Sequence, residues 1–211
     1  KHYVLESSGP YYLNLALRLS QKRIRITVAN ALRVKRFIQM KGERNKSDKK
    51  DAYMIYQYGL EQELELWKAP SDTQVRSRQI MTSIALFTKQ RTMLMNRKHS
   101  VEHQPIQDKY QLRSIKRVLR ELEKEIEGLE AALEKIISEW APEQYQNLQT
   151  IPGIGKKVSM TLIVRTDAFT KVDNYRHLIS LAGMAPKEFS SGSSVRARTR
   201  ICKMGGADIR R

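Results

Sequence analysis

The sequence contains little cysteine, comparatively few acidic residues and no long apolar run. Its one cysteine, Cys202, excludes an internal disulfide framework and a cysteine-rich zinc site, which favours a reducing compartment. No apolar run approaches the roughly 20 residues that span a bilayer, and the mean hydropathy is −0.56. We therefore expect a cytoplasmic protein without a membrane partner. The chain begins at Lys1 without a methionine, which is typical of a fragment.

Basic residues dominate the charge. The 39 Lys and Arg residues against 22 Asp and Glu give a net charge of +17 and a pI near 10.1. Residues 1–50 carry a net +10 and residues 151–211 a net +8, while residues 51–111 carry +1 and residues 112–150 carry −2. Two basic ends around a neutral spacer predict a polyanionic partner, with nucleic acid the first candidate. The alternative is a basic protein of ribosomal type.

The N-terminal part alternates between strand and helix patterns. Residues 3–6 and 24–28 have the character of short strands, with a helix between them and further helices near 31–40 and 48–58. This order predicts a βαβ unit with parallel strands. Two strands are too few for a free-standing sheet covered by helices, so we expect the first strands of an α/β domain to be missing.

A long amphipathic helix follows. Its apolar residues alternate at spacings of three and four over four heptads: Leu112, Ile115, Leu119, Leu122, Ile126, Leu129, Leu133, Ile136 and Trp140. One helix cannot bury such a seam alone. It must pair with another chain, fold back on the helical stretch 72–98, or do both, and we expect both, with a homodimer formed through a coiled coil.

The turn Ile151-Pro152-Gly153-Ile154-Gly155 is typical of a helix-hairpin-helix element. Glycines let the backbone approach a phosphate, and free N–H groups at the start of the next helix bind it. Gly153, Gly155, Lys156 and Lys157 are therefore candidate contacts to a DNA backbone. The alternative is an ordinary tight turn between helices.

Three carboxylates form a candidate metal site. Asp48 and Asp51 share one face at a helix start, and Glu6 ends the first strand, so the three side chains can converge at one edge of the sheet. Carboxylates in such a group bind Mg²⁺, which assists phosphoryl transfer. The alternative assigns Asp48 to an N-cap and Asp51 to the helix dipole.

A serine-glycine segment, Phe189-Ser190-Ser191-Gly192, precedes a basic stretch. A serine in this setting can act as a nucleophile towards phosphate, with cations stabilising the transition state. Arg196, Arg198, Arg200 and Lys203 are the candidate cations. From these residues alone, a flexible turn is the stronger interpretation. His99 and His103 lack a third ligand and are expected at the surface.

Several segments together resemble the insertion-sequence transposases of the Piv/DEDD type. The N-terminal ones are VLESSGPYY, ITVANALRVKRF and NKSDKKDAYMIYQY; the C-terminal ones are LQTIPGIGKKVSMTLI and YRHLISLAGMAPKEFSSGSSVRARTRICKMGGADIRR. The resemblance implies a mixed, mostly α protein. It has a partial RuvC-like (RNase-H-like) nuclease domain over 1–70, a coiled-coil region over 71–147 and an α-helical C-terminal transposase domain over 148–211.

The resemblance also implies roles. Glu6, Asp48 and Asp51 match the last three members of the DEDD metal set, the first of which would precede Lys1, and Ser191 matches the proposed nucleophile. Gly206 stands where Asn is usual, and Ser8 where Thr is usual. Members of the family are similar in using a structured guide RNA.

The sequence thus predicts a bacterial or archaeal DNA transposase, associated with the nucleoid, that uses Mg²⁺ and is guided by RNA. Because the first acidic residue is missing, we expect this chain alone to be inactive. A metal-only junction resolvase, in which Ser191 is structural, and a non-catalytic DNA- or RNA-binding remnant are the alternatives.

Overall fold

The structure is a computed structural model that describes residues 1–42, 47–187, 190–191, 195–196 and 198–210. The chain divides into two compact units, Lys1–Pro70 and Ser71–Arg211. Within the described residues, no helix combines the length and the apolar character that a membrane span requires.

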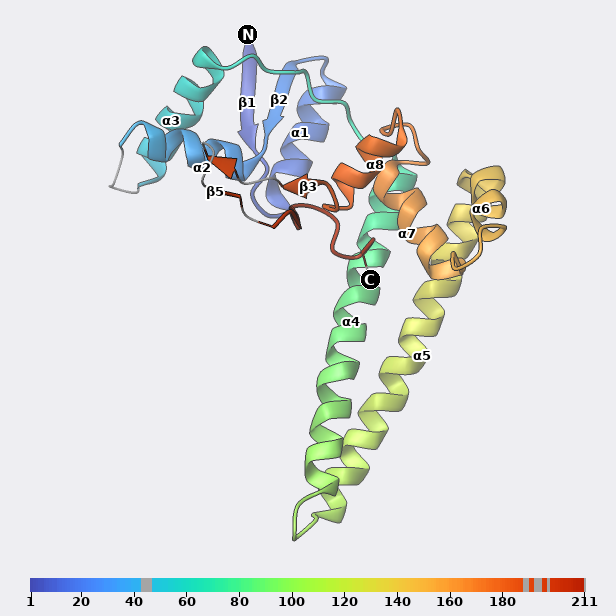
Figure 1. Cartoon of the computed structure of the whole chain (residues 1–211). Helices are drawn as coiled ribbons and strands as arrows, with labels where there is room; N and C mark the ends of the chain where they lie inside the picture. Colours follow the sequence, from blue (N-terminus) through green and yellow to red (C-terminus); the bar gives the residue numbers. More distant parts are fainter. Residues whose placement is uncertain (43–46, 188–189, 192–194, 197, 211) are drawn as a thin grey trace. The chain divides into compact units, whose positions relative to one another are not determined.

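The first unit is built on two parallel strands, as the sequence predicts. Its elements are β1 (His2–Glu6), α1 (Tyr11–Gln21), β2 (Arg25–Ala29), α2 (Ala31–Met40) and α3 (Asp48–Glu61). The two strands pair in register from His2 opposite Arg25 to Glu6 opposite Ala29. Because α1 connects strands that run in the same direction, both carboxyl ends meet at one edge of the sheet (Figure 1).

Helices α2 and α3 enclose the core of this unit. The fully buried side chains of this core come from β2, α2 and α3: Ala29, Val34, Phe37, Met54 and Tyr58. The Phe37 and Tyr58 rings pack edge to face with centroids 5.3 Å apart. Helix α3 lies close to β1 at Gly59, where an added Cβ would come within 2.8 Å of Val4 Cγ2. Glycine at this position therefore lets the helix pack closely on the strand.

The second unit is largely helical. It contains α4 (Asp72–Glu102), α5 (Lys109–Trp140), α6 (Pro142–Gln149), α7 (Lys156–Thr166) and α8 (Tyr175–Leu181). Four two-residue strands follow and form two antiparallel pairs: β3 (Pro186–Lys187) with β6 (Arg200–Ile201), and β4 (Ser190–Ser191) with β5 (Val195–Arg196). The sequence analysis did not predict these strands.

Helices α4 and α5 run antiparallel as a long hairpin, here called the arm (Figure 1). The seam of α5 thus packs on the 72–98 stretch of its own chain, one of the two arrangements that the sequence left open. Within the seam, Leu119, Ile126 and Leu133 are buried, whereas Leu122 and Leu129 stay partly exposed. Helix α4 alone therefore does not cover the whole seam.

The base of the arm joins four helices in one core. Its buried residues come from α5, α6, α7 and the joint between α5 and α6: Leu133, Ile137, Ala141, Tyr145, Met160, Ile163 and Val164. Ile80 and Ile84 of α4 pack against this group. The core fixes the start of α7 beside the C-terminal half of α5. This places charged groups of the two helices together.

Truncation of this core tests its contribution. Ile137 is completely buried, so Ile137→Ala leaves a cavity and should lower the free energy of unfolding by about 2–5 kcal/mol. Val118→Ala, on an exposed face of the same helix, should change it by less than about 0.5 kcal/mol. Urea unfolding followed by Trp140 fluorescence, in a protein that also carries Trp67→Phe, measures both, and equal effects would contradict the assigned core.

Candidate functional site

Glu6 and the two aspartates of α3 lie in the first unit. Glu6 is the last residue of β1, next to Ser7, whose N–H donates to the Ala29 carbonyl oxygen over 2.9 Å. Asp48 and Asp51 occupy the first turn of α3, and α3 begins on the side to which the strands point (Figure 1). The alternative role of Asp48 as an N-cap is wrong, because Ser47 is the N-cap and accepts from the Lys50 N–H.

The donor chemistry of these carboxylates suits a hard divalent cation, because all their ligand atoms are oxygen. In the part of the chain that the structure describes, none of the three side chains has a hydrogen-bond or ion-pair partner. The three are not gathered, however: among described residues no group of three or more His, Cys, Asp or Glu side chains is close enough to hold a metal ion. The convergence of Glu6 with Asp48 and Asp51 is thus not seen.

The proposed nucleophile lies in the second unit, on a strand. Antiparallel pairing places the backbone of Ser191 opposite Val195 and that of Ser190 opposite Arg196. Phe189 and Gly192, which completed the serine motif, lie outside the described residues. In the part of the motif that the structure describes, Ser190–Ser191, the backbone forms a β pair; the flexible-turn interpretation of the whole segment stays a prediction.

The basic stretch after the serine is held to the end of α8. Arg200 lies in β6 opposite Lys187, and Arg198 is exposed just before it. The Cys202 N–H donates to the Ala185 carbonyl and the Lys203 N–H to the Gly183 carbonyl, both over 2.9 Å. These bonds fix the path of the chain that carries the predicted cations.

Two glycines make this close path feasible. Gly183 (φ +66°) and Gly205 (φ +122°) both adopt backbone conformations that favour glycine. A Cβ on Gly205 would lie 2.5 Å from the Leu181 carbonyl oxygen. Gly206 is followed by a turn, so within the described residues no helix needs the N-cap that an Asn there would supply.

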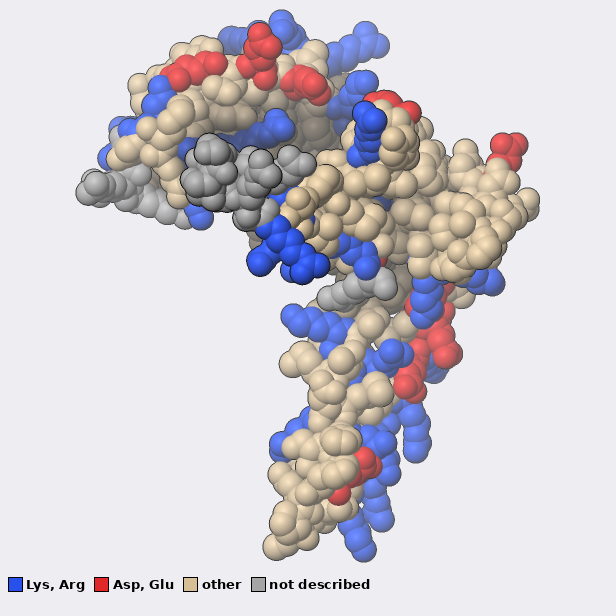
Figure 2. All heavy atoms as spheres, viewed as in Figure 1, with Lys and Arg blue, Asp and Glu red and all other residues tan. Residues whose placement is uncertain are grey.

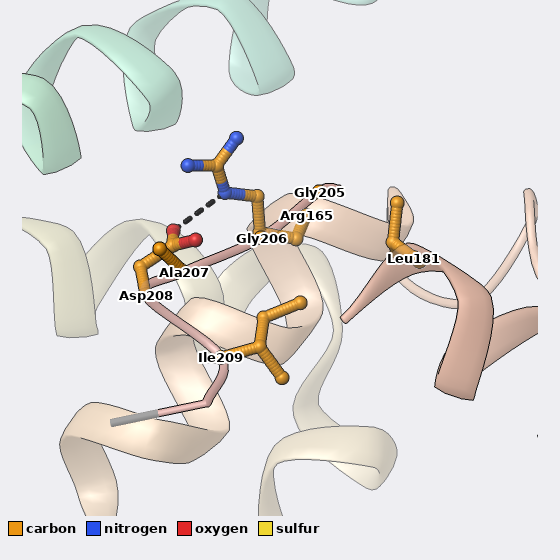
Figure 3. A pocket seen from close by; sticks show the side chains of 7 residues that line it. All are labelled: Arg165, Leu181, Gly205, Gly206, Ala207, Asp208 and Ile209. Atoms are coloured by element: carbon orange, nitrogen blue, oxygen red, sulfur yellow. Dashed lines mark hydrogen bonds and ion pairs between the residues drawn. The ribbon is translucent and has the colours of Figure 1, made fainter. Parts of the chain in front are cut away.

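A cavity of about 550 Å³ borders the same chain segment (Figure 3). Arg165 and Leu181 line it together with residues 205–209. Among its lining residues, the Arg165 Nε donates to Asp208 Oδ2 over 2.6 Å, and this pair ties α7 to the C-terminal segment (Figure 3). Sequence reasoning missed the pair, because 43 residues separate its members and no local pattern links them.

The turn between α6 and α7 has the geometry that its glycines suggest. Gly153 has φ +88°, and Gly155 is the N-cap of α7 without a side-chain cap. Neither position has an atom within 4 Å of an added Cβ, so the described structure leaves open space around both glycines. This open, uncapped helix start is able to accept an anion.

The two lysines at this helix start are already paired. Lys156 Nζ lies 2.7 Å from Glu134 Oε1, and Lys157 Nζ lies 2.7 Å from Glu130 Oε1. Both carboxylates belong to α5, so the acidic base of the arm faces the turn. Both lysine side chains remain more than half exposed. A phosphate at this turn therefore competes with the protein's own carboxylates.

Tyr145 of α6 completes this charged group. Its hydroxyl donates to Glu134 Oε1 over 2.9 Å. Burial, and then this hydrogen bond, raise the pKa of Tyr145 to about 12. The hydrogen bond from Lys156, with that from Tyr145, holds the pKa of Glu134 below its usual range.

Comparison with known proteins adds independent evidence. Residues 1–103 match the DEDD transposase family of the IS110 type, and residues 145–211 match the Transposase IS116/IS110/IS902 family. Together the two matches support an IS110-type DEDD transposase. Pilin gene-inverting proteins of Moraxella bovis and Moraxella lacunata are each 26% identical to it over 99% of its length. The chain spans 64% of the length of each relative.

The burial of the Tyr145 hydroxyl can be tested by absorbance. The raised pKa predicts that the 295 nm titration difference between the native protein and Tyr145→Phe has its midpoint near pH 12. In the protein unfolded by urea, the midpoint of this difference should move to about pH 10, the ordinary pKa of a tyrosine phenol. The neutral phenol thus stabilises the fold fully below about pH 10, and that contribution is lost as the pH rises through about 12. A midpoint near 10 in the folded protein would contradict the burial of this hydroxyl.

The ion pairs of the turn give a second prediction. Glu130→Gln/Glu134→Gln frees Lys156 and Lys157, so duplex DNA should bind more tightly, with a salt dependence steeper by up to about 1.8 in log K against log salt. Glu139→Gln/Glu143→Gln removes the same charge from exposed positions without a described ion pair. Fluorescence anisotropy compares the two variants. If both double variants gained the same affinity for DNA, the result would show that Lys156 and Lys157 do not contact DNA.

Proposed function

We propose that the chain is the core of an enzyme that cuts and rejoins DNA during transposition or inversion of a DNA segment. The matches to transposase families over residues 1–103 and 145–211 carry this proposal. The name of the Moraxella relatives, pilin gene-inverting protein, supports DNA inversion as a related reaction. The net charge of +17 suits a DNA substrate. Such an enzyme would work in the cytoplasm of a bacterium or archaeon, on the nucleoid.

Ser191 is the proposed nucleophile. Its hydroxyl oxygen bonds to a DNA phosphorus and loses its proton, while the bond from phosphorus to the leaving sugar oxygen breaks and that oxygen gains a proton. The product is a covalent serine–DNA intermediate. The hydroxyl of a second DNA end then attacks the same phosphorus and releases the Ser191 oxygen, which takes up the proton, and this reverse step joins the strands. Arg196, Arg198, Arg200 and Lys203 bind the flanking phosphates and stabilise the charge that develops at phosphorus. Support comes from the pairing of β4 with β5, which puts the Arg196 backbone beside Ser190.

Glu6, Asp48 and Asp51 are the proposed Mg²⁺ ligands. A bound Mg²⁺ would act as a Lewis acid on a phosphoryl oxygen. The three carboxylates lack described partners and are at least partly exposed, so they are available to a cation. Their own role is to supply negatively charged oxygen ligands at the carboxyl edge of the sheet.

Two further partners belong to the proposal. A homodimer through the arm is supported by the partly exposed seam residues Leu122, Leu129 and Ile136, which a second copy would cover. A structured guide RNA is proposed from the resemblance of the sequence segments, and the basic charge fits it. The turn at Gly153 and Gly155, with Lys156 and Lys157, would bind the DNA backbone and position the duplex.

Covalent capture tests the chemistry. The product of the complete reading frame is incubated with Mg²⁺, candidate RNA and labelled junction-bearing DNA, and the mixture is run on a denaturing protein gel. We expect a protein–DNA adduct with the native protein and with Ser190→Ala, and none with Ser191→Ala. Asp51→Asn should reduce the rate of strand cleavage by a factor of about 10² or more, which is the usual effect of removing one group that stabilises the transition state electrostatically.

Two outcomes would replace the proposal. Cleavage that depends on metal and on Asp51 but survives Ser191→Ala without an adduct would indicate a metal-only junction resolvase. DNA binding without cleavage in any protein would indicate a non-catalytic nucleic-acid-binding remnant.

A further inference from the structure

The outer half of the arm is rich in basic residues. Helix α4 has no acidic residue from Thr73 to Val101, and α5 has none from Lys109 to Arg120. From Glu121 to Glu139 the composition of α5 reverses, with seven glutamates and two lysines. The two halves of one helix therefore carry charges of opposite sign.

The cations of α5 lie on a single face. At 3.6 residues per turn, six of them fall within a sector of about 100°. This group, here called the basic stripe, consists of Lys109, Arg113, Lys116, Arg117, Arg120 and Lys124. All six are exposed, and the sector lies about 130° from the apolar seam, on the solvent side. Figure 2 shows Lys and Arg side chains along the edge of the arm that α5 forms.

The stripe is not explained by ion pairing within the chain. All of 71–140 is described, and the structure gives no ion pair to any of its six cations. Each cation lies three or four residues from at least one other, an arrangement that destabilises a helix through like-charge repulsion. A bound polyanion would relieve this repulsion.

We propose that the basic stripe binds the phosphate backbone of duplex DNA, with α5 lying against the duplex. The six cations extend over about 22 Å at 1.5 Å per residue. Over 22 Å of duplex axis the two strands together present roughly 13 phosphates, at one charge per about 1.7 Å, so a straight basic face of this length meets several of them. The acidic half of α5, near the base of the arm, repels the same backbone, so the contact made by α5 itself is confined to its outer half.

The stripe favours a duplex over a single strand. Single-stranded nucleic acids are bound by basic grooves with aromatic side chains on which bases stack. Tyr110 is the one aromatic residue between Lys109 and Lys124. The choice of DNA over RNA rests on the proposed function, whereas the contact itself rests on the charge and geometry of α5.

Salt-dependent binding tests the stripe. The assay uses a duplex of about 30 bp, which is longer than the stripe. Arg113→Gln/Arg117→Gln/Arg120→Gln removes three phosphate contacts, so the slope of log K against log salt should become shallower by about 2.7. At 0.1 M salt this corresponds to a loss of affinity of roughly 500-fold relative to 1 M salt, where the electrostatic term vanishes. Arg113→Lys/Arg117→Lys/Arg120→Lys keeps the charges and should keep the slope. Circular dichroism verifies that the helices form.

The matched control removes three exposed cations near the base of the arm: Arg76→Gln/Arg78→Gln/Lys135→Gln. It lowers the net charge equally and should change the slope much less. An unchanged slope in the stripe variant, or an equal change in the control, would overturn the inference. A change confined to a duplex RNA of the same sequence would overturn the assignment to DNA. Because this assay measures binding alone, a protein that fails to cut DNA would refute the proposed function without affecting this result.

Discussion

The second unit depends on the burial of the apolar seam of α5. A helix of 32 residues with one apolar face is stable in water only when that face is covered. Helix α4 covers the seam along the arm, and α7 covers Ile137 at its base. Leu133 and Ile137 are buried to 2% and 0% exposure, whereas Leu129 nearby stays partly exposed. The seam therefore determines where the C-terminal helices pack and which apolar surface is left.

The orientation of the same seam determines where the charged side chains of α5 lie. Once its apolar face is fixed towards α4, the remaining positions are directed to solvent or to α7. At the base these positions are glutamates, and Glu130 and Glu134 meet the lysines that begin α7. In the outer half they are cations with no described ion-pair partner. Two of the acidic groups, Glu130 and Glu134, thus have partners inside the protein, and the exposed basic groups are available to the partner that we propose outside it.

Local patterns in the sequence predicted most of the helices and both strands of the first unit. The alternation of Ile24, Ile26 and Val28 indicates β2, and the spacing of three and four indicates α5. Two-residue strands such as β4 carry no period that a sequence can display, so β3 to β6 were missed. The pairs Arg165–Asp208 and Lys156–Glu134 join residues far apart in the chain, and only tertiary packing reveals them. The capping role fell to Ser47 instead of Asp48, a difference of one residue that propensity cannot resolve.

The residues that we propose for the chemistry are split between the two units. The two groups differ in how firmly the surrounding structure holds them. The carboxylates stand at the end of a strand and at the start of a helix, and none of them has a described partner that fixes its side chain. The cations near Ser191 stand on a segment whose main chain is bonded to the end of α8 at three points, through the N–H groups of Cys202, Lys203 and Gly206. A segment held in this way presents its charges to phosphate at little further entropic cost. The main chain of the proposed phosphate-binding segment is therefore preorganised at residues 202–206, whereas the proposed metal ligands would still have to be gathered, for example by a cation, before they could act together.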